Sequence, residues 1–391
     1  MDHLPSEITT QILSRLPVKY VFRCRSVCKT WLNIIDDRRL FTPLHFTRSL
    51  EEEATPHNKS TFIFASSTGR YPFYIVDKEQ SQSAFKSTRI YVSGSDYNII
   101  YANSCNGLLC YSFPTNQGNG YSTFIQNPAT QEVVNLPDSN STQESTNIHF
   151  RHFMLYVHNL GFGFDSSSSL FKVLQVLHKS NGLPHSAPVK AQVCTLGSNT
   201  WRRLRNFPRV SCYRSAPVLI NGSLHWMTYE HILSFDLASE NFEFLQLPEI
   251  YLSGPRRFRP EKNFRLVALD GCLSVADSSS DEDVQLWIMK EYNVKESWIK
   301  LIVKSRYVED SVLFKNVIPI CFWKNGELLL LYGSQILVTY EIESGRYTPF
   351  DIEGLPAYRF DCLKGSYGYE VYPYVGNLMS INTICRMEAQ P

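Results

Sequence analysis

The chain has 391 residues, almost no net charge and no long hydrophobic run. Its 38 basic and 37 acidic residues give a formal net charge of +1, so no strong field draws in nucleic acid or an anionic membrane, and recognition must be local. No stretch of about 18 apolar residues occurs, which argues against a transmembrane helix. The first 25 residues include Asp2, Glu7, Arg15, Lys19 and Arg23, and we expect no signal peptide there.

Sequence motifs of common enzymes and metal sites are also missing. There is no Gly-rich phosphate loop, no G-x-S-x-G and no H-E-x-x-H. The ten cysteines are irregularly spaced, and we interpret them as reduced core residues of a protein of the cytoplasm or nucleus. In that compartment the sequons at Asn58, Asn140 and Asn221 are chance matches. We therefore expect no cofactor and no metal.

The residues that are abundant favour β structure. Hydrophobic residues make up 43% of the chain, enough for a sizeable core, and aromatic residues make up 13%, with 22 Tyr and 24 Phe. Aromatic side chains are enriched in strands. A chain of this length predicts a large domain with a small one, or two domains.

The first fifty residues have a different, helical periodicity. Pro5 can start a helix, and Ile8, Ile12 and Leu16 recur every four residues. Pro17 stops that helix, and two further short helical runs follow as far as residue 46. Three helices in about forty residues bury little surface, so their apolar residues either await a partner or pack on the next domain. The pattern alone leaves both possibilities open.

Four strings of residues in this segment resemble an F-box along its whole length. They are Leu4-Pro5-Ser6-Glu7-Ile8, Ile12-Leu13-Ser14-Arg15-Leu16-Pro17-Val18-Lys19, Arg23-Cys24-Arg25-Ser26-Val27-Cys28-Lys29-Thr30-Trp31 and Leu32-Asn33-Ile34-Ile35. Ile8 stands where Leu is commoner. The resemblance implies docking to a Skp-type adaptor and, through it, to cullin and RING subunits. It places these residues at adaptor-binding positions: Leu4, Pro5, Ile8, Leu16, Pro17, Val18, Val21, Val27, Cys28 and Trp31. The last of these positions serve docking in some family members and the core in others.

Cys24 and Cys28 would share one face of a helix. A tetrahedral metal site needs further ligands, and neither a second cysteine pair nor a nearby histidine supplies them. We expect no metal here.

From about residue 60 a repeat of Asn-Gly or Asp-Gly followed by an apolar strand appears. These dipeptides are strong hairpin signals, and they occur at Asn106-Gly107, Asn221-Gly222, Asp270-Gly271 and Asn325-Gly326. The string Leu160-Gly161-Phe162-Gly163-Phe164-Asp165 marks a fifth copy in altered form. A second element, an apolar strand and turn followed by an aromatic residue, keeps step with the first.

Units of about fifty residues with two hairpins each predict the blades of a β-propeller. Residues 60–100 and 355–386 are each too short for a blade and could join as a shared closing blade, so we expect six blades. A β-sandwich is the alternative that the regular spacing disfavours. The expected organisation is a three-helix F-box (1–46), a connector with the first propeller strands (47–94) and the main propeller (95–386).

The repeats also resemble the plant F-box-associated, kelch-like domain over roughly residues 95–350. The resemblance is carried by the following strings: Ser104-Cys105-Asn106-Gly107-Leu108-Leu109, Asn127-Pro128-Ala129-Thr130, Gly161-Phe162-Gly163-Phe164-Asp165, Val218-Leu219-Ile220-Asn221-Gly222-Ser223-Leu224-His225-Trp226 and Ile232-Leu233-Ser234-Phe235-Asp236.

Few residues in the repeats are candidates for chemistry. His149, His152 and His158 cluster without a partner at ligand spacing, and residues 278–283 read as a solvated loop. His225 lies in a repeat strand and is expected in the core or a cavity. The basic stretch Arg256, Arg257 and Arg259, with Lys262 and Arg265, is either a solvated loop or a contact for an acidic target.

Together these features predict a non-enzymatic, substrate-recognition subunit of an SCF-type (Skp-cullin-F-box) ubiquitin ligase that presents a bound protein for ubiquitination and proteasomal degradation. The sequence does not identify that protein. The alternative is a propeller small-molecule receptor or enzyme whose F-box only controls its turnover; a cavity with converging polar groups would favour it. A nucleic-acid binder is disfavoured by the charge.

Overall fold

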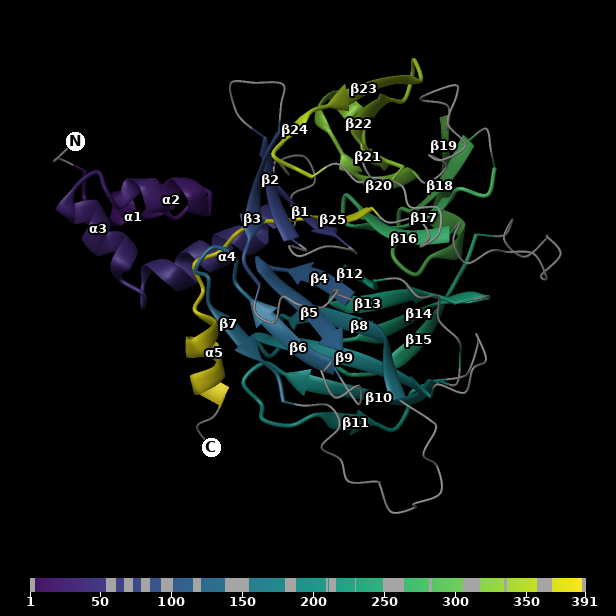
Figure 1. The fold of residues 1–391 in the computed structure, drawn as a ribbon, viewed down its shortest axis with the longest axis horizontal. Coiled ribbons are helices and arrows are strands. Elements are labelled where there is room, and N and C mark those ends of the chain that lie inside the picture. The colour runs from purple at the N-terminus through teal and green to yellow at the C-terminus, as the bar shows by residue number, and fades with distance from the viewer. Residues whose placement is uncertain are drawn as a thin grey trace.

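The structure is a computed structural model of the chain (Figure 1). It describes residues 4–53, 61–66, 73–78, 85–92, 101–114, 121–137, 155–179, 188–208, 210, 216–228, 230–248, 264–280, 283–304, 317–333, 336–356 and 368–388. In this part of the chain no helix is long and apolar enough to span a membrane.

Four helices form a module at the beginning of the chain, which we call the helical module. They are α1 (Ser6–Leu13), α2 (Val18–Cys24), α3 (Lys29–Asp36) and α4 (Phe41–Glu53). The small core of the module consists of Leu13, Val21, Ile35 and Phe41. The three expected helices are present, and α4 continues through residue 46, where we had placed the end of the first domain.

Both prolines that we expected at helix boundaries precede a helix. Pro5 is the N-cap residue of α1, and Pro17 is the N-cap residue of α2. In both cases the proline has an extended backbone and needs no N–H donor, so the helix can begin immediately after it.

The strands that follow the helical module form six sheets arranged as the blades of a propeller, and all their pairs are antiparallel except one short parallel pair in the first sheet. Blades 2 to 6 each contain four consecutive strands: β4–β7, β8–β11, β12–β15, β16–β19 and β20–β23. Their bounds are β4 (Tyr101–Cys105), β5 (Leu108–Pro114), β6 (Tyr121–Gln126), β7 (Val133–Asn135), β8 (Leu155–Asp165), β9 (Leu170–Lys179), β10 (Pro188–Thr195), β11 (Arg202–Leu204), β12 (Val218–Ile220), β13 (Ser223–Met227), β14 (His231–Asp236), β15 (Phe242–Gln246), β16 (Phe264–Leu269), β17 (Cys272–Asp277), β18 (Asp283–Met289), β19 (Trp298–Lys304), β20 (Val317–Phe322), β21 (Leu328–Tyr332), β22 (Ile336–Glu341) and β23 (Arg346–Phe350). Short 3-10 turns lie at Lys295–Ser297 and Lys324–Gly326.

Blade 1 is shared by the two ends of the chain. Its order is β25-β1-β2-β3-β24, with β1 (Thr61–Ser66), β2 (Phe73–Lys78), β3 (Phe85–Ile90), β24 (Ile352–Glu353) and β25 (Tyr369–Pro373). Strand β25 pairs antiparallel with β1, placing Phe62 opposite Pro373. The prediction of six blades with a shared closing blade is thus confirmed, and the β-sandwich alternative is wrong.

The innermost strands of the blades surround the propeller axis. Strand β4 contacts β8, β16 contacts both β12 and β20, and β25 contacts both β4 and β20. Blade 3 meets blade 4 where β8 contacts β13. These contacts close the ring of six blades.

The Asn-Gly and Asp-Gly pairs form the tight turns between the first and second strands of four blades. At Asn106-Gly107 the φ angles are 46° and 75°, and the other three pairs also have two positive values. Two consecutive residues with positive φ make the turn that matches the twist of a β-hairpin, which explains this dipeptide at each position. The hairpins predicted there are confirmed.

The Gly-Phe-Gly-Phe-Asp string lets blades 3 and 4 approach closely. A Cβ atom on Gly161 would lie 2.6 Å from Leu224 Cδ1, and one on Gly163 would lie 2.5 Å from Leu237 Cδ1. Between these glycines, Phe162 stacks on Phe171, with ring centroids 5.6 Å apart. The string therefore encodes packing between blades.

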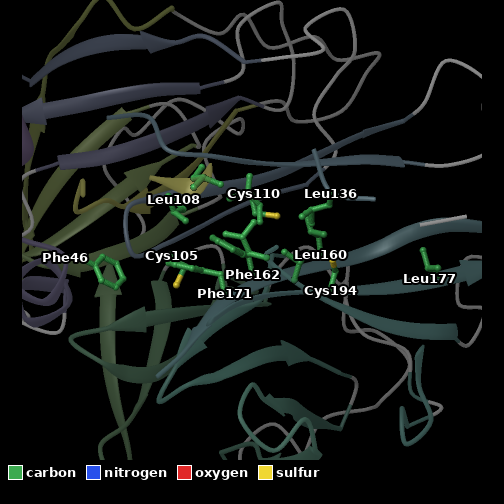
Figure 2. Close-up of a cluster of buried hydrophobic side chains, with 14 residues drawn as sticks. Phe46, Cys105, Leu108, Cys110, Leu136, Leu160, Phe162, Phe171, Leu177 and Cys194 are labelled. Atoms are coloured by element: carbon green, nitrogen blue, oxygen red, sulfur yellow. The ribbon is translucent and has the colours of Figure 1, made fainter. Parts of the chain in front are cut away.

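The last helix, α5 (Ile381–Glu388), lies beside α4 and blade 2 (Figure 1). Phe46 of α4 and Ile381 of α5 both belong to the buried cluster between blades 2 and 3, which also contains Cys110, Phe162 and Phe171 (Figure 2). The Phe46 ring lies edge-on to Phe164 at 5.7 Å between centroids. The helical module and the propeller therefore share a core.

Candidate functional site

Exposed apolar side chains are concentrated on the helical module. Of the thirteen large hydrophobic residues that are exposed in the described part of the chain, six lie between residues 4 and 40. Leu4 is 54% exposed, and Ile8 and Ile12, one turn apart on α1, are 47% and 50% exposed. Val27 is 60% exposed. Exposed apolar side chains at this density are typical of a surface that binds another protein.

Most of the predicted adaptor-binding residues are accessible. Pro5, Pro17 and Cys28 are exposed along with Leu4, Ile8 and Val27. Leu16 and Trp31 are half-buried and pack against the core of the module, so their remaining surface is smaller.

Two of the predicted residues are core residues in this structure. Val21 is completely buried, and Val18 is 8% exposed. Val18 faces the end of the chain, because a Cβ atom on Gly376 would lie 3.4 Å from Val18 Cγ2. Neither side chain presents apolar surface to a partner here, because helix α2 turns this side inward.

Sequence reasoning missed three exposed residues of the same module. These are Ile12, Phe22 and Leu40, which are 50%, 39% and 72% exposed. None of them is among the predicted adaptor-binding residues. The four-residue spacing of Ile8 and Ile12 was a usable signal, but periodicity alone does not distinguish an exposed apolar stripe from a buried one.

The cysteines at 24 and 28 have local structural roles. The Sγ atom of Cys28 accepts a hydrogen bond from the Trp31 backbone N–H at 3.5 Å, which caps α3. Cys24 packs against the core of the module. Within the described residues, no group of three or more His, Cys, Asp or Glu side chains could hold a metal ion.

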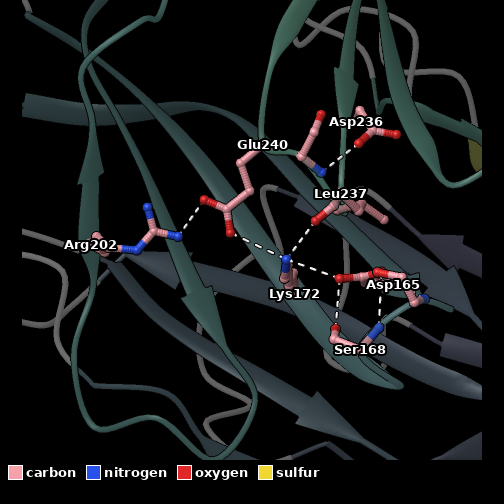
Figure 3. Close-up of polar contacts among 9 residues, drawn as sticks. Asp165, Ser168, Lys172, Arg202, Asp236, Leu237 and Glu240 are labelled. Carbon is pink, nitrogen blue, oxygen red and sulfur yellow. Dashed lines mark hydrogen bonds and ion pairs between the residues drawn. The ribbon is translucent and has the colours of Figure 1, made fainter.

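A buried ionic cluster joins blades 3 and 4 (Figure 3). The Nζ of Lys172 lies 3.1 Å from Asp165 Oδ2 and 3.2 Å from Glu240 Oε1, and it donates a hydrogen bond to the Leu237 carbonyl at 2.5 Å. Arg202 also pairs with Glu240. Asp165, Lys172 and Arg202 come from blade 3. Leu237 and Glu240 lie in the turn between β14 and β15 of blade 4, so the cluster fixes one blade against the next.

Neighbouring hydrogen-bond donors stabilise the ionised form of the Asp165 side chain. Burial by itself would raise the pKa of Asp165, but hydrogen bonds from Ser167, Ser168 and Lys172 outweigh it and lower the pKa below its usual value. Every charged group in the cluster has an opposite partner. The final Asp of the Gly-Phe-Gly-Phe-Asp string is therefore explained by structure.

A second contact between blades involves His225, which is fully buried as expected for a core residue. Its Nδ1 lies 3.1 Å from the Val218 carbonyl, which can only accept, so Nδ1 carries the proton. Its Nε2 then accepts a hydrogen bond from the Tyr292 hydroxyl at 2.8 Å. Burial lowers the pKa of His225 to about 4, so the ring is neutral near neutral pH.

The basic stretch is only partly described. Arg256, Arg257, Arg259 and Lys262 lie outside the described residues. Arg265 forms two contacts with Glu370, at 2.5 and 2.8 Å, which link β16 of blade 5 to β25 of blade 1. Since blade 6 lies between these blades in the ring, the pair joins two blades that are not neighbours. Arg265 of the basic stretch therefore pairs with a residue of the propeller itself.

The remaining candidates, His149, His152, Asp281 and Glu282, lie outside the described residues, as does the side chain of His158.

A cleft of ≈880 Å³ lies where the helical module meets the propeller. Phe22 and Arg38 line it from the helical module, Glu132 and Phe164 from blades 2 and 3, and Ile384 from α5. This volume is within the range of small-ligand sites. The cleft also shows that three separate parts of the chain meet at this junction.

Comparison with known proteins agrees with both parts of the structure. Residues 1–43 match the family described as F-box domain, and residues 59–375 match the family described as F-box associated beta propeller domain. The chain thus belongs to the F-box proteins with an F-box associated β-propeller domain.

The relatives are F-box proteins of Arabidopsis thaliana. The chain is 27% identical to F-box protein At3g07870, over 91% of this chain and 89% of that protein. It is 26% identical to F-box protein CPR1, over 91% of this chain and 86% of that protein. It is also 26% identical to F-box/kelch-repeat protein At3g23880, over 77% of this chain and 79% of that protein.

Proposed function

We propose that this chain is the substrate-recognition subunit of an SCF-type ubiquitin ligase. The observation that carries the proposal is the exposed apolar surface of Leu4, Ile8, Ile12 and Val27 on an F-box domain. F-box domains generally bind Skp1-type adaptors, and the adaptor would cover this surface. Removing these apolar side chains from water would favour binding.

In this proposal the chain performs no chemistry of its own. The propeller holds a protein target so that its lysines lie close to the ubiquitin-loaded subunit, and the rate comes from a raised effective concentration. The ligase would act in the cytoplasm or the nucleus.

The docking surface can be tested with a double substitution, Leu4→Asp with Pro5→Gly. Leu4 is 54% exposed and contributes nothing to the buried core, so we expect a folded chain that no longer co-purifies with a Skp1-type adaptor. A charge placed in an apolar interface remains without a partner and is costly to desolvate.

Phe244→Asp is the matched control, because Phe244 is 47% exposed but lies on the outer strand of blade 4. It should leave co-purification unchanged. Adaptor capture by the Leu4 and Pro5 variant at the level of the parent chain would refute the docking surface.

A further inference from the structure

The chain enters and leaves the propeller at the same point. The first strand β1 pairs with the last strand β25, and the Tyr374 backbone N–H donates to the Thr61 carbonyl at 3.0 Å. The helical module precedes β1, and residues 374–388 follow β25. These two parts of the chain, more than 300 residues apart in sequence, therefore lie next to each other (Figure 1).

Residues 374–388 are bound tightly to blade 2 at Asn377, which is completely buried. The Asn377 amide donates to the carbonyl of Asn106, in the first turn of blade 2. In return, Asn127 Nδ2 lies 3.2 Å from the Asn377 side-chain oxygen and 2.9 Å from the Met379 carbonyl. These bonds fix the backbone of the segment from both sides.

The same segment completes the core of the helical module. Leu378 packs against the cluster of Leu13, Val21, Ile35 and Phe41, and Gly376 lies against Val18. Three consecutive residues, Gly376, Asn377 and Leu378, thus alternate between the helical module and blade 2.

Helix α5 anchors the end of the segment. Glu132 of blade 2 accepts hydrogen bonds from the Ser380 hydroxyl at 2.9 Å and from the Asn382 backbone N–H at 3.3 Å, at the first turn of the helix. A carboxylate at this position also complements the positive end of the helix dipole. Ile381 then enters the buried cluster that holds Phe46 of α4.

We infer that residues 374–388 act as a brace, the C-terminal brace, which fixes the F-box domain at one position on the propeller. Most of the brace lies outside the two matched domains, which end at residues 43 and 375. Because it directly continues β25, closure of the propeller and placement of the F-box domain are coupled. The inference does not depend on ubiquitin transfer.

The turn at Asn106-Gly107 offers a matched pair of variants. Gly107 and Gly222 have nearly the same φ, 75° and 72°, so alanine at either position strains the turn equally. A Cβ atom on Gly107 would lie 2.6 Å from the Val375 carbonyl oxygen and 2.7 Å from Asn377 Nδ2, whereas nothing lies within 4 Å of one on Gly222. Only Gly107→Ala displaces the brace.

The test is single-molecule energy transfer in the full chain, with dyes on unnatural amino acids that replace the exposed residues Arg39 and Glu243. The parent chain and Gly222→Ala should give one narrow distribution. Gly107→Ala, Asn377→Ala and a chain ending at Val375 should each broaden it or split it into several populations. Adaptor capture, measured separately, should persist, because Leu4, Ile8 and Val27 are unchanged.

One narrow distribution in the chain ending at Val375 would overturn the inference. If that chain does not fold, the Gly107→Ala and Gly222→Ala pair decides, and equal distributions in the two would overturn it. Failure of all variants, and of the parent, to capture the adaptor would count against the proposed function and leave the brace result intact.

Discussion

The ionic cluster between blades 3 and 4 yields a quantitative prediction for Lys172→Met. Methionine keeps most of the volume of the side chain but removes its charge. Asp165 and Glu240 would then lose the cation that lies 3.1 and 3.2 Å from them. Removing one partner of a buried ion pair costs about 3–5 kcal/mol, and we take the lower end because Ser167 and Ser168 still donate to Asp165.

The expected change in melting temperature follows from the size of the propeller. An unfolding entropy of about 2.1 cal/mol/K per residue, over the 317 residues from 59 to 375, is about 0.7 kcal/mol/K. A loss of about 3 kcal/mol therefore lowers Tm by about 4–5 °C, which differential scanning calorimetry can resolve.

Arg346→Met provides the control, because Arg346 pairs with Glu341 on the surface, with the two side chains 71% and 40% exposed. Exposed pairs of this kind contribute at most about 1 kcal/mol. If Lys172→Met lowers Tm no more than Arg346→Met does, the cluster does not hold the blades together and our reasoning is refuted.

Two more predictions concern the contacts between blades. Burial lowers the pKa of His225 from 6.5 to about 4, so between these values the unfolded chain binds the extra proton and stability falls as the pH drops, by up to about 3 kcal/mol. His225→Asn should flatten this slope in urea titrations at several pH values, and an unchanged slope would contradict the assignment. Gly163→Ala should cost about 1–3 kcal/mol in thermal unfolding, because Leu237 is fully buried and cannot move away freely. A variant as stable as the parent would show that blades 3 and 4 have room between them.

Local signals in the sequence were sufficient to predict the propeller and its six blades. The Asn-Gly and Asp-Gly pairs indicate turns in which two consecutive residues need positive φ, a conformation that few other residues adopt. The spacing of these pairs indicates the length of a blade. The shared closing blade followed from two segments that were each too short. The hairpins could be predicted because each turn depends on two neighbouring residues, and the closing blade because neither end segment has enough strands for a blade of its own.

Long-range contacts could not be read in the same way. Val18 and Val21 lie three residues apart on α2, and no local feature shows that residues 376 and 378, more than 350 residues later, cover that side. Arg265 was grouped with a basic stretch that was either a solvated loop or a contact for an acidic target, because its partner in the fold, Glu370, is 105 residues away. Helix α4, which runs to Glu53, was not among the three predicted helices, and its Phe46 packs against residues of blades 2 and 3 that are distant in the sequence.

The position of the C-terminal brace determines when, during synthesis of the chain, the core of the helical module can be completed. The F-box sequence leaves the ribosome before the propeller, whereas β25, which closes the ring, and Leu378, which completes the core of the helical module, follow more than 300 residues later. Domains generally fold as units from the N-terminus during synthesis. Here the core of the helical module is completed only by residues that follow the propeller, so a nascent chain that has not reached Leu378 lacks a firmly seated F-box domain.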